Sequence, residues 1–515
     1  MQRKHRLAIA IVVAAGLIGW NQWQRHRAGD TAEAAPAAAI RDADGPAPKR
    51  RLGSLEFEPC ALPLMSGAAL DAQCTTFDVA ENPAAPQGRK IALNIAWLPA
   101  SEEADVAPDP VFFIAGGPGQ AAVESYPLLD AAFGEVRKHR NVVLVDQRGT
   151  GKSNPLDCPL PDDGDAGDDN DPAASLALAE HCRDTLSKKA DLRFYTTTDA
   201  VRDLDAVRAA IGAERINLVG VSYGTRVAQQ YAMRQPQHTR SIVLDSVVPN
   251  TLVLGNIFAR NLDDALALQF GQCEKDPVCR EKLGDPRKEL DTLLDTLRRN
   301  PPLVRYRDAA TGEFAQTRLQ AMQVAGLVRM YAYMPTVATL LPVLVHEANQ
   351  GRYESLTALI RMLQGQMKDA MAMGMQLSVV CSEDGDGIAA TGTDAGTVLG
   401  HALTDFMAAQ CKAWPKGEVP AGFHAPLSTP VPALVLEGEY DPVTPPRYGK
   451  EVASSLPNGR LLVLRGQGHN VIGAGCMPKL FAQFVEKTDA KALDAKCLDT
   501  LAYAQPFTSY NGWNP

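Results

Sequence analysis

The sequence predicts an α/β fold: a mostly parallel sheet flanked by helices, with a largely helical block inserted before the last strands. Two observations support this prediction. Short, continuous apolar runs alternate with segments of helical periodicity, the pattern of parallel strands that are buried on both faces. A mostly helical stretch, residues 251–428, then separates the early strands from the late ones. The chain has 515 residues, enough for one large domain with an insertion or for two domains.

The first part of this alternation covers residues 56–250. A helix is expected over Thr198–Ile211, whose apolar residues recur at helical intervals, with Thr198 as the N-cap, and a second helix is expected over Thr225–Arg234. Strands are expected at the short apolar runs Ile91–Leu98, Val111–Ile114, Asn141–Val145, Ile216–Gly220 and Ile242–Leu244.

The alternation resumes over residues 429–515, with strands expected at Ala433–Gly438 and Arg460–Leu464. The helical block between the two parts is expected to be a cap over an active site. Eight of the 13 methionines lie between Met322 and Met375, inside this block. Methionines can line an adaptable apolar pocket, although ordinary helix core is the better explanation for most of them individually.

The N-terminus predicts export. Residues 1–6 are basic, and Leu7–Trp20 is an uncharged apolar run that is short for a helix spanning a bilayer. Residues 1–27 are therefore expected to be a signal peptide or an uncleaved membrane anchor. The Trp and Arg residues that follow the run favour the anchor. Residues 28–55, rich in Ala, Pro and charge, are expected to be a linker, and the body is expected to be periplasmic or otherwise extracytoplasmic.

Cysteine usage agrees with export. The ten cysteines fall as neighbouring pairs, Cys60/Cys74, Cys158/Cys182, Cys273/Cys279, Cys381/Cys411 and Cys476/Cys497. The sequence proves no connectivity, but short loops close most readily and an oxidising compartment would keep them closed. Neither C-x-x-C nor H-E-x-x-H occurs, so we expect no metal site and no cofactor.

Composition excludes several classes of protein. Apolar residues make up 45% and charged residues 22% of the chain, as in soluble globular proteins, which excludes a disordered, collagenous or polytopic membrane protein. The net charge of −9 gives no electrostatic basis for binding nucleic acid.

The segment Gly220-Val221-Ser222-Tyr223-Gly224 matches the pattern G-x-S-x-G. The pattern alone is weak, because a chain of this length can match it by chance. Here, however, it follows a predicted strand and precedes a predicted helix. In that setting it forms the strained turn that raises a nucleophilic serine above the sheet of an α/β-hydrolase fold. Ser222 is therefore the candidate nucleophile.

A serine hydroxyl needs a base, and the base needs an acid to orient it. In the α/β-hydrolase fold the three residues follow the chain order Ser, Asp or Glu, His. Asp441 follows the predicted strand Ala433–Gly438 and His469 follows Arg460–Leu464, at strand ends where sites of open α/β sheets form. A loop histidine with a structural hydrogen bond is the alternative for His469 alone. The position of His469 at a strand end, and its place after Ser222 and Asp441 in the chain, favour a triad of Ser222, Asp441 and His469.

An acyl-transfer site also needs backbone donors for the oxyanion of its tetrahedral intermediate. The amide of Tyr223, next after the candidate nucleophile, is one expected donor. The second is expected from Gly117, because the glycines of the loop 115–119 let the backbone approach a substrate closely.

These motifs resemble those of the proline iminopeptidase family, and within it the exported tripeptidyl aminopeptidase-like branch. The loop 115–119 is similar to the family's HGGPG, except that Ala115 replaces the histidine, and residues 146–153 are similar to DQRGxGxS. Further similar segments are Tyr195–Thr197, Asp203–Arg208, Ser222–Thr225, Cys381–Glu383 and Cys411–Pro415. The resemblance extends from about Cys60 to Cys497. The missing histidine leaves the oxyanion glycines in place and concerns only the positioning of the loop.

The resemblance implies a serine exopeptidase that removes short N-terminal units, beside proline or hydrophobic residues, from peptides. A carboxylesterase with the same triad is the alternative, because fold and triad do not determine the bond that is cleaved. A non-catalytic binding module is a more remote alternative. The family binds the free amine of its substrate through acidic side chains of the cap, and Glu383 and Asp384 are the candidates here. The alternative is that these two acids do not bind substrate and are only solvent-exposed side chains of a loop beside a disulfide.

Overall fold

The computed structural model describes residues 49–64, 67–158, 172–309, 311–367 and 371–513. The predicted signal peptide or anchor, residues 1–27, lies outside the described residues, and so does the predicted linker up to residue 48. Within the described ranges, no helix has the length and apolar character needed to cross a membrane.

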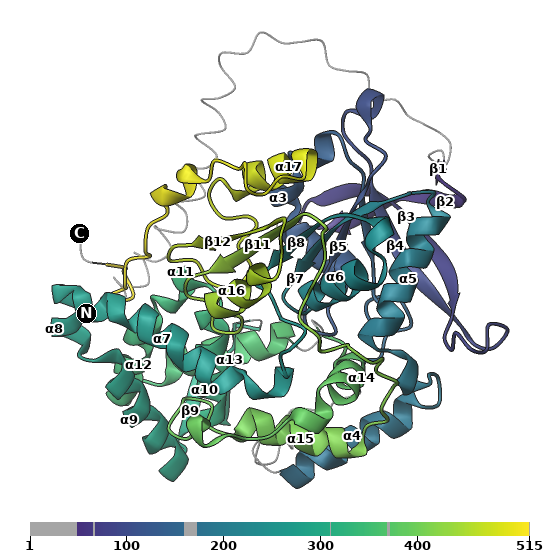
Figure 1. The fold of residues 1–515 in the computed structure, drawn as a ribbon. Coiled ribbons are helices and arrows are strands. Elements are labelled where there is room, and N and C mark those ends of the chain that lie inside the picture. Colours follow the sequence, from purple (N-terminus) through teal and green to yellow (C-terminus); the bar gives the residue numbers. More distant parts are fainter. Residues whose placement is uncertain (1–48, 65–66, 159–171, 310, 368–370, 514–515) are drawn as a thin grey trace, which may run out of the picture. The chain divides into compact units, whose positions relative to one another are not determined.

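A ten-stranded sheet forms the centre of residues 49–515, in the order β1-β2-β3-β4-β6-β5-β7-β8-β11-β12 (Figure 1). The strands from β6 to β12 in this order pair in parallel, whereas β1 to β4 and the β4–β6 pair are antiparallel. The expected mostly parallel sheet of an α/β-hydrolase fold is confirmed. The strands are β1 (Arg50–Leu52), β2 (Leu55–Pro63), β3 (Ala69–Ala80), β4 (Lys90–Leu98), β5 (Val111–Ile114), β6 (Val142–Val145), β7 (Ile216–Val221), β8 (Thr239–Asp245), β11 (Ala433–Gly438) and β12 (Gly459–Leu464).

Every strand expected from an apolar run is present, but β1, β2 and β3 of this sheet were not predicted, and neither was a two-stranded hairpin in the helical block. Strand β1 (Arg50–Leu52) and the first residue of β2, Leu55, lie within the predicted linker 28–55, so the end of that linker is part of the sheet. In β2 and β3 most residues are exposed or half-buried, so polar residues and prolines interrupt the apolar pattern, as is common at the edge of a sheet.

Helices cover both faces of the sheet (Figure 1). Phe112 and Phe113 of β5 point into two different apolar cores, because successive side chains of a strand face opposite sides. The core around Phe112 includes side chains of α5 (Thr197–Ala210), α6 (Tyr223–Arg234) and α16 (Pro446–Ser454). The core around Phe113 includes side chains of α2 (Ala122–Ser125), α3 (Asp130–Phe133) and α17 (Met477–Lys487).

The N-cap of α5 corrects one expectation: it is Thr196 and not Thr198. The Thr196 hydroxyl accepts a hydrogen bond from the amide of Asp199, and the Asp199 carboxylate accepts one from the amide of Thr196. This reciprocal capping box satisfies two amide groups that the helix itself leaves free. Thr198 lies inside the first turn.

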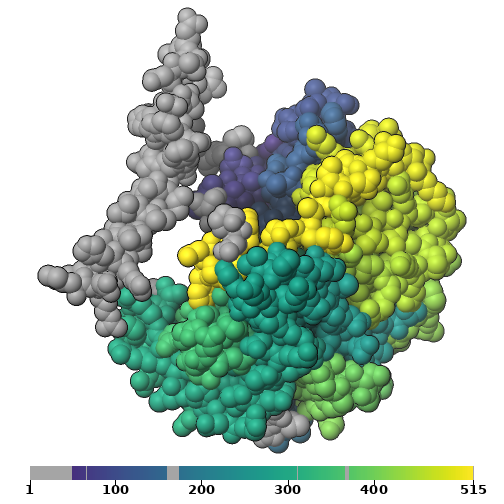
Figure 2. Space-filling view, turned by 90° about the vertical axis from the view of Figure 1, so that its left-hand side faces the viewer, coloured from purple at the N-terminus to yellow at the C-terminus, as the bar shows by residue number. Residues whose placement is uncertain are grey.

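The block between β8 and β11 is largely helical, as expected. Helices α7, α9, α10, α12 and α13 share an apolar core of their own. In the space-filling view, the teal and green residues of this block form a lobe beside the yellow C-terminal part (Figure 2). The elements are α7 (Phe258–Lys275), α8 (Pro277–Leu283), α9 (Pro286–Arg299), the hairpin β9 (Leu303–Arg307) and β10 (Phe314–Arg318), α10 (Ala321–Ala332), α11 (Pro335–Ala338), α12 (Leu341–Asn349), α13 (Glu354–Met367), α14 (Met373–Glu383) and α15 (Ala402–Ala413).

Helices α14 and α15 differ from the rest of this block. Met375 and Val379 of α14, and Met407 of α15, belong to the core that α5 and α6 form with the sheet. Helix α15 also contacts α4 (Pro172–Leu186). The last part of the predicted cap is therefore packed into the hydrolase core.

Five disulfides pair the ten cysteines as neighbours in the sequence, as expected. One of them joins α7 to α8, and another joins α14 to α15. This number of disulfides indicates a protein that resides outside the reducing cytoplasm. The pairs are Cys60–Cys74, Cys158–Cys182, Cys273–Cys279, Cys381–Cys411 and Cys476–Cys497.

Candidate active site

Ser222 lies at a sharp turn between β7 and α6, with φ 55° and ψ −124°. The neighbouring glycines are required by close approach of backbone segments. A Cβ on Gly220 would lie 2.3 Å from the carbonyl oxygen of Gly224, and a Cβ on Gly224 would lie 2.3 Å from that of Ile114. The Ser222 amide donates to the carbonyl of Asp245 at 2.9 Å, which connects the turn to the end of β8. This is the strained serine turn that the motif predicted.

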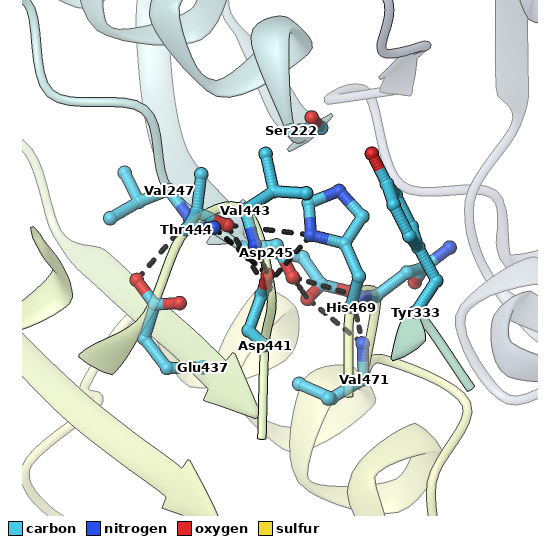
Figure 3. A network of polar contacts seen from close by, with 12 residues as sticks. Ser222, Asp245, Val247, Tyr333, Glu437, Asp441, Val443, Thr444, His469 and Val471 are labelled. Carbon is cyan, nitrogen blue, oxygen red and sulfur yellow. Dashed lines mark hydrogen bonds and ion pairs between the residues drawn. The ribbon is translucent and has the colours of Figure 1, made fainter. Parts of the chain in front are cut away.

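Asp441 and His469 are hydrogen-bonded, with 2.8 Å between Asp441 Oδ2 and His469 Nδ1. Asp441 also accepts hydrogen bonds from the amides of Val443 and Thr444, both at 2.8 Å, and from the Thr444 hydroxyl at 2.9 Å. Figure 3 shows Ser222 beyond the opposite edge of the His469 ring. The structure therefore brings the three predicted triad residues together in the order serine, histidine, aspartate.

The surroundings of this pair favour charge separation. Burial alone would lower the pKa of His469, but the charge of Asp441 and its hydrogen bond outweigh this effect and raise the pKa above 6.5. Burial alone would raise the pKa of Asp441, but His469 and the amides of Thr444 and Val443 hold it below its ordinary value. The ring can therefore take up a proton while the carboxylate stays ionised, as a general base requires.

The glycine-rich loop passes beside the serine. A Cβ on Gly116 would lie 3.1 Å from Ser222 Cβ, so nothing larger than glycine fits there without a shift. Gly117 follows in the left-handed region, at φ 105°. Tyr223 is the first residue of α6, where amide groups have no partner within the helix. The two predicted oxyanion donors, Gly117 and Tyr223, thus belong to the two segments that meet at Ser222.

The segment 146–153 supports this arrangement through buried polar contacts. Asp146 accepts hydrogen bonds from Asn94 Nδ2 at 2.7 Å and from the amide of Val123 at 2.9 Å, just after the glycine-rich loop. Arg148 makes two hydrogen bonds of 2.6 Å with the carboxylate of Asp203 on α5. These motif residues anchor the loops around the site to the sheet and to α5.

A second acid, which no sequence motif marked, holds the loop that carries His469. Asp245 ends β8 and is completely buried, and its carboxylate accepts hydrogen bonds from the amides of Val471 and Ile472. Burial raises the pKa of Asp245 to about 6, although the two amides oppose this shift. The next residue, Ser246, accepts the amide hydrogen of Asn470 at 2.8 Å. An aspartate at the end of an apolar strand, as at Asp441, was the signal that could have identified it.

The helical block contacts both sides of the site. The carbonyl of Tyr333, just after α10, accepts the amide hydrogen of His469 at 3.0 Å, and the two rings pack edge to face at 5.1 Å. In Figure 3 the Tyr333 hydroxyl points to the side where Ser222 lies. On the other side, the amide of Ala372 donates to the carbonyl of Gly119 in the glycine-rich loop. No sequence motif had marked Tyr333.

Glu383 and Asp384, the candidates for binding a substrate amine, are buried at the end of α14. Glu383 accepts hydrogen bonds from the amide of Thr197 at 2.7 Å and from its hydroxyl at 3.0 Å. Asp384 pairs with Arg226 of α6 at 2.8 Å. Burial, opposed by Arg226, raises the pKa of Glu383 to about 8. Asp384 Oδ1 is the oxygen of these two carboxylates that has no hydrogen-bond partner among the described residues.

Comparisons with known proteins agree with this architecture. A family model described as alpha/beta hydrolase fold matches residues 109–327, and one described as TAP-like protein matches residues 397–497. The chain is thus a serine hydrolase of the α/β-hydrolase class. The TAP-like match and the relatives below are consistent with the branch of this family that contains tripeptidyl aminopeptidases and proline iminopeptidases.

Three relatives illustrate the relationship. The serine protease Hip1 of Mycobacterium tuberculosis is 25% identical over 425 residues, 74% of this chain and 79% of the relative. The tripeptidyl aminopeptidase of Streptomyces lividans is 30% identical over 190 residues, 34% of this chain and 35% of the relative. The proline iminopeptidase of Xylella fastidiosa is 28% identical over 138 residues, 27% of this chain and 32% of the relative.

Proposed function

We propose that this protein is an exported serine aminopeptidase that removes short N-terminal units from peptides, with Ser222, His469 and Asp441 as its catalytic triad. One observation carries the proposal: Asp441 is hydrogen-bonded to one edge of the His469 ring, and Ser222, on its strained turn, lies beyond the other edge. This arrangement can turn a hydroxyl into a nucleophile.

In the proposed reaction, Ser222 Oγ attacks the carbonyl carbon of the scissile bond and its proton passes to His469 Nε2. Asp441 stabilises the imidazolium that forms. The amides of Tyr223 and Gly117 stabilise the oxyanion. The imidazolium then protonates the leaving amine, the C–N bond breaks, and an acyl-enzyme remains on Ser222. Water, deprotonated by His469, hydrolyses this ester and releases the N-terminal unit.

The choice of a peptidase rests on the relatives, whose names include a serine protease, a tripeptidyl aminopeptidase and a proline iminopeptidase. A carboxylesterase remains the second candidate, because the same triad serves both reactions. A panel of free-amine peptide amides, N-blocked peptide amides and simple esters distinguishes the two. Cleavage of esters alone would assign the esterase.

The nucleophile is tested with a fluorophosphonate, which reacts covalently with an activated serine. Ser222→Ala is expected to abolish labelling and to lower kcat by a factor of about 10⁴–10⁶ with the fold intact. Thr225→Ser, one turn along α6, is the matched control that leaves Ser222 in place. Labelling that persists in Ser222→Ala would assign the reactive serine elsewhere.

Export is part of the proposal. Its support is the set of five disulfides together with the basic and apolar residues 1–27. The division into a core of residues 56–250 and 429–515 with a cap of residues 251–428 stays a prediction, and so does amine binding by Glu383 and Asp384.

A further inference from the structure

Arg329 of α10 is a half-buried cation close to the candidate triad. Its Nη2 donates a hydrogen bond to the Tyr333 hydroxyl at 3.3 Å, and its guanidinium lies over the rings of Phe258 and Tyr333, at 4.9 and 5.8 Å from their centres. These contacts orient the guanidinium without neutralising it. Among the residues that the structure describes, no carboxylate lies within ion-pair distance of Arg329.

Other buried arginines of this chain do have acidic partners. Arg148 pairs with Asp203, Arg226 with Asp384 and Arg140 with Asp109. A cation that is partly removed from water without such a partner is costly, and an anionic ligand offsets that cost. Arg329 therefore has the properties of a group that is kept free for an anion.

The position of Arg329 indicates which end of a substrate this anion would occupy. Tyr333 packs against His469, so Arg329 lies on the histidine side of the site, whereas the glycine-rich loop lies on the other. The histidine protonates the leaving group, so the leaving group departs on the side of the site where the histidine lies. The charge of Arg329 also opposes that of a protonated His469. A carboxylate bound to Arg329 would neutralise its charge and so remove this repulsion.

We infer that Arg329 and the Tyr333 hydroxyl form a subsite for a carboxylate on the leaving-group side of the substrate. The guanidinium presents paired N–H donors that match the two oxygens of a carboxylate. The Tyr333 hydroxyl accepts its hydrogen bond from Arg329, so its own hydrogen is available to a ligand. This inference rests on the proposed peptidase function and specifies the substrate class: short peptides whose free C-terminal carboxylate lies one or two residues beyond the scissile bond.

The test compares two forms of one short peptide, with a free C-terminal carboxylate and with a C-terminal amide. The wild-type enzyme is expected to favour the carboxylate form by about 10- to 100-fold in kcat/KM, and Arg329→Gln is expected to abolish this preference. Arg329→Lys should keep part of it, because the charge stays and the paired donors are lost. Tyr333→Phe removes only the hydroxyl and should reduce the preference several-fold, which keeps the test informative if Arg329→Gln does not fold.

Arg298→Gln is the matched control. It removes the same charge from an exposed position on α9, where Arg298 pairs with Asp295, and should leave the preference unchanged. Equal rates for the two peptide forms in the wild-type enzyme, or an unchanged preference in Arg329→Gln, would overturn the subsite. Failure of the proposed function looks different, because the wild-type enzyme would then cleave neither peptide, whether or not it reacts with the fluorophosphonate.

Discussion

Both carboxylate oxygens of Asp245 lie within hydrogen-bond distance of the amide nitrogen of Val471, at 2.9 and 3.0 Å. Val471 follows His469 by two residues, so the end of β8 fixes the loop that carries the candidate base. Asp245 reaches the chemistry only through this loop and is a positioning residue. Catalysis depends on such positioning, since small displacements of a reacting group are costly.

Asp245→Asn should therefore lower kcat while leaving KM nearly unchanged. An asparagine amide would turn N–H groups toward the amides of Val471 and Ile472, and we expect a loss of about 10- to 100-fold in kcat for an uncharged ester. Ser246→Ala, which removes only the acceptor for the Asn470 amide, should cost less. Circular dichroism controls for folding. Wild-type kcat in folded Asp245→Asn would show that the clamp is dispensable.

The pH dependence of activity follows from the charges around His469. The base acts only when neutral and its pKa is raised above 6.5, so kcat/KM should fall as the pH drops through a midpoint above 6.5. Asp441 and Asp245 raise this pKa, whereas Arg329 lowers it. The midpoint should therefore move down in Asp441→Asn and up in Arg329→Gln. Rate profiles with an uncharged ester test both signs, and movement in the same direction would contradict the assignment.

Substrate amine recognition is tested with Glu383→Gln. If Glu383 binds the ammonium, kcat/KM for free-amine peptides should fall, and the fall should correspond to a loss of about 2–4 kcal/mol of transition-state stabilisation. The rate of ester hydrolysis should barely change. Because the pKa of Glu383 is about 8, the effect should be largest near that pH, where acid and substrate amine are both partly charged. Asp386→Asn is the control, since Asp386 is 93% exposed three residues away. Equal losses on both substrates would make Glu383 structural.

Glu383 also predicts how stability varies with pH. Its pKa is about 8 in the folded protein and about 4.5 in an unfolded chain, so the folded state holds the proton more tightly. This contribution to stability is complete at pH values below 4.5 and is lost as the pH rises through 8. Glu383→Gln should therefore flatten the decrease in Tm between about pH 5 and pH 9. A slope equal to that of the wild type would mean that other groups cause the decrease.

Thiol titration tests the disulfides and, with them, the oxidising compartment. Denatured protein purified without reductant should react with almost no thiol reagent, and the same protein should expose ten thiols after reduction. A cytoplasmically expressed sample is the comparison. Ten reactive thiols in the exported, unreduced sample would contradict both expectations.

The strands from β4 to β8, the strands β11 and β12, and the triad candidates could be predicted because their signals are local. A continuous apolar run marks a buried strand, and the residues at G-x-S-x-G, Asp441 and His469 each follow such a run. Tyr333 and Arg329 carry no local signal. They reach the site only because α10 ends against the His469 loop, and no periodicity or motif encodes that contact.

Two further differences have the same physical origin. The contacts of Glu383 and Asp384 with Thr197 and Arg226 could not be predicted, because these partners precede the two acids by more than 150 residues in the chain. Thr198, the expected N-cap of α5, is the last of three consecutive threonines. Only the reciprocal contact of Thr196 with Asp199 decides between them.

The packing of α14 determines which part of the cap could be replaced by the corresponding part of a related protein. Met375 of α14 lies against Gly149, and the amide of Ala372, just before α14, donates a hydrogen bond to the carbonyl of Gly119. The end of the predicted cap is therefore packed into the hydrolase core. A chimaera that replaced residues 251–428 as one unit would strip apolar surface from the sheet. The part of the cap that can be exchanged as a unit therefore runs from α7 to α13. A chimaera that exchanges this part should fold only when α14 and α15 come from the same protein as the hydrolase core.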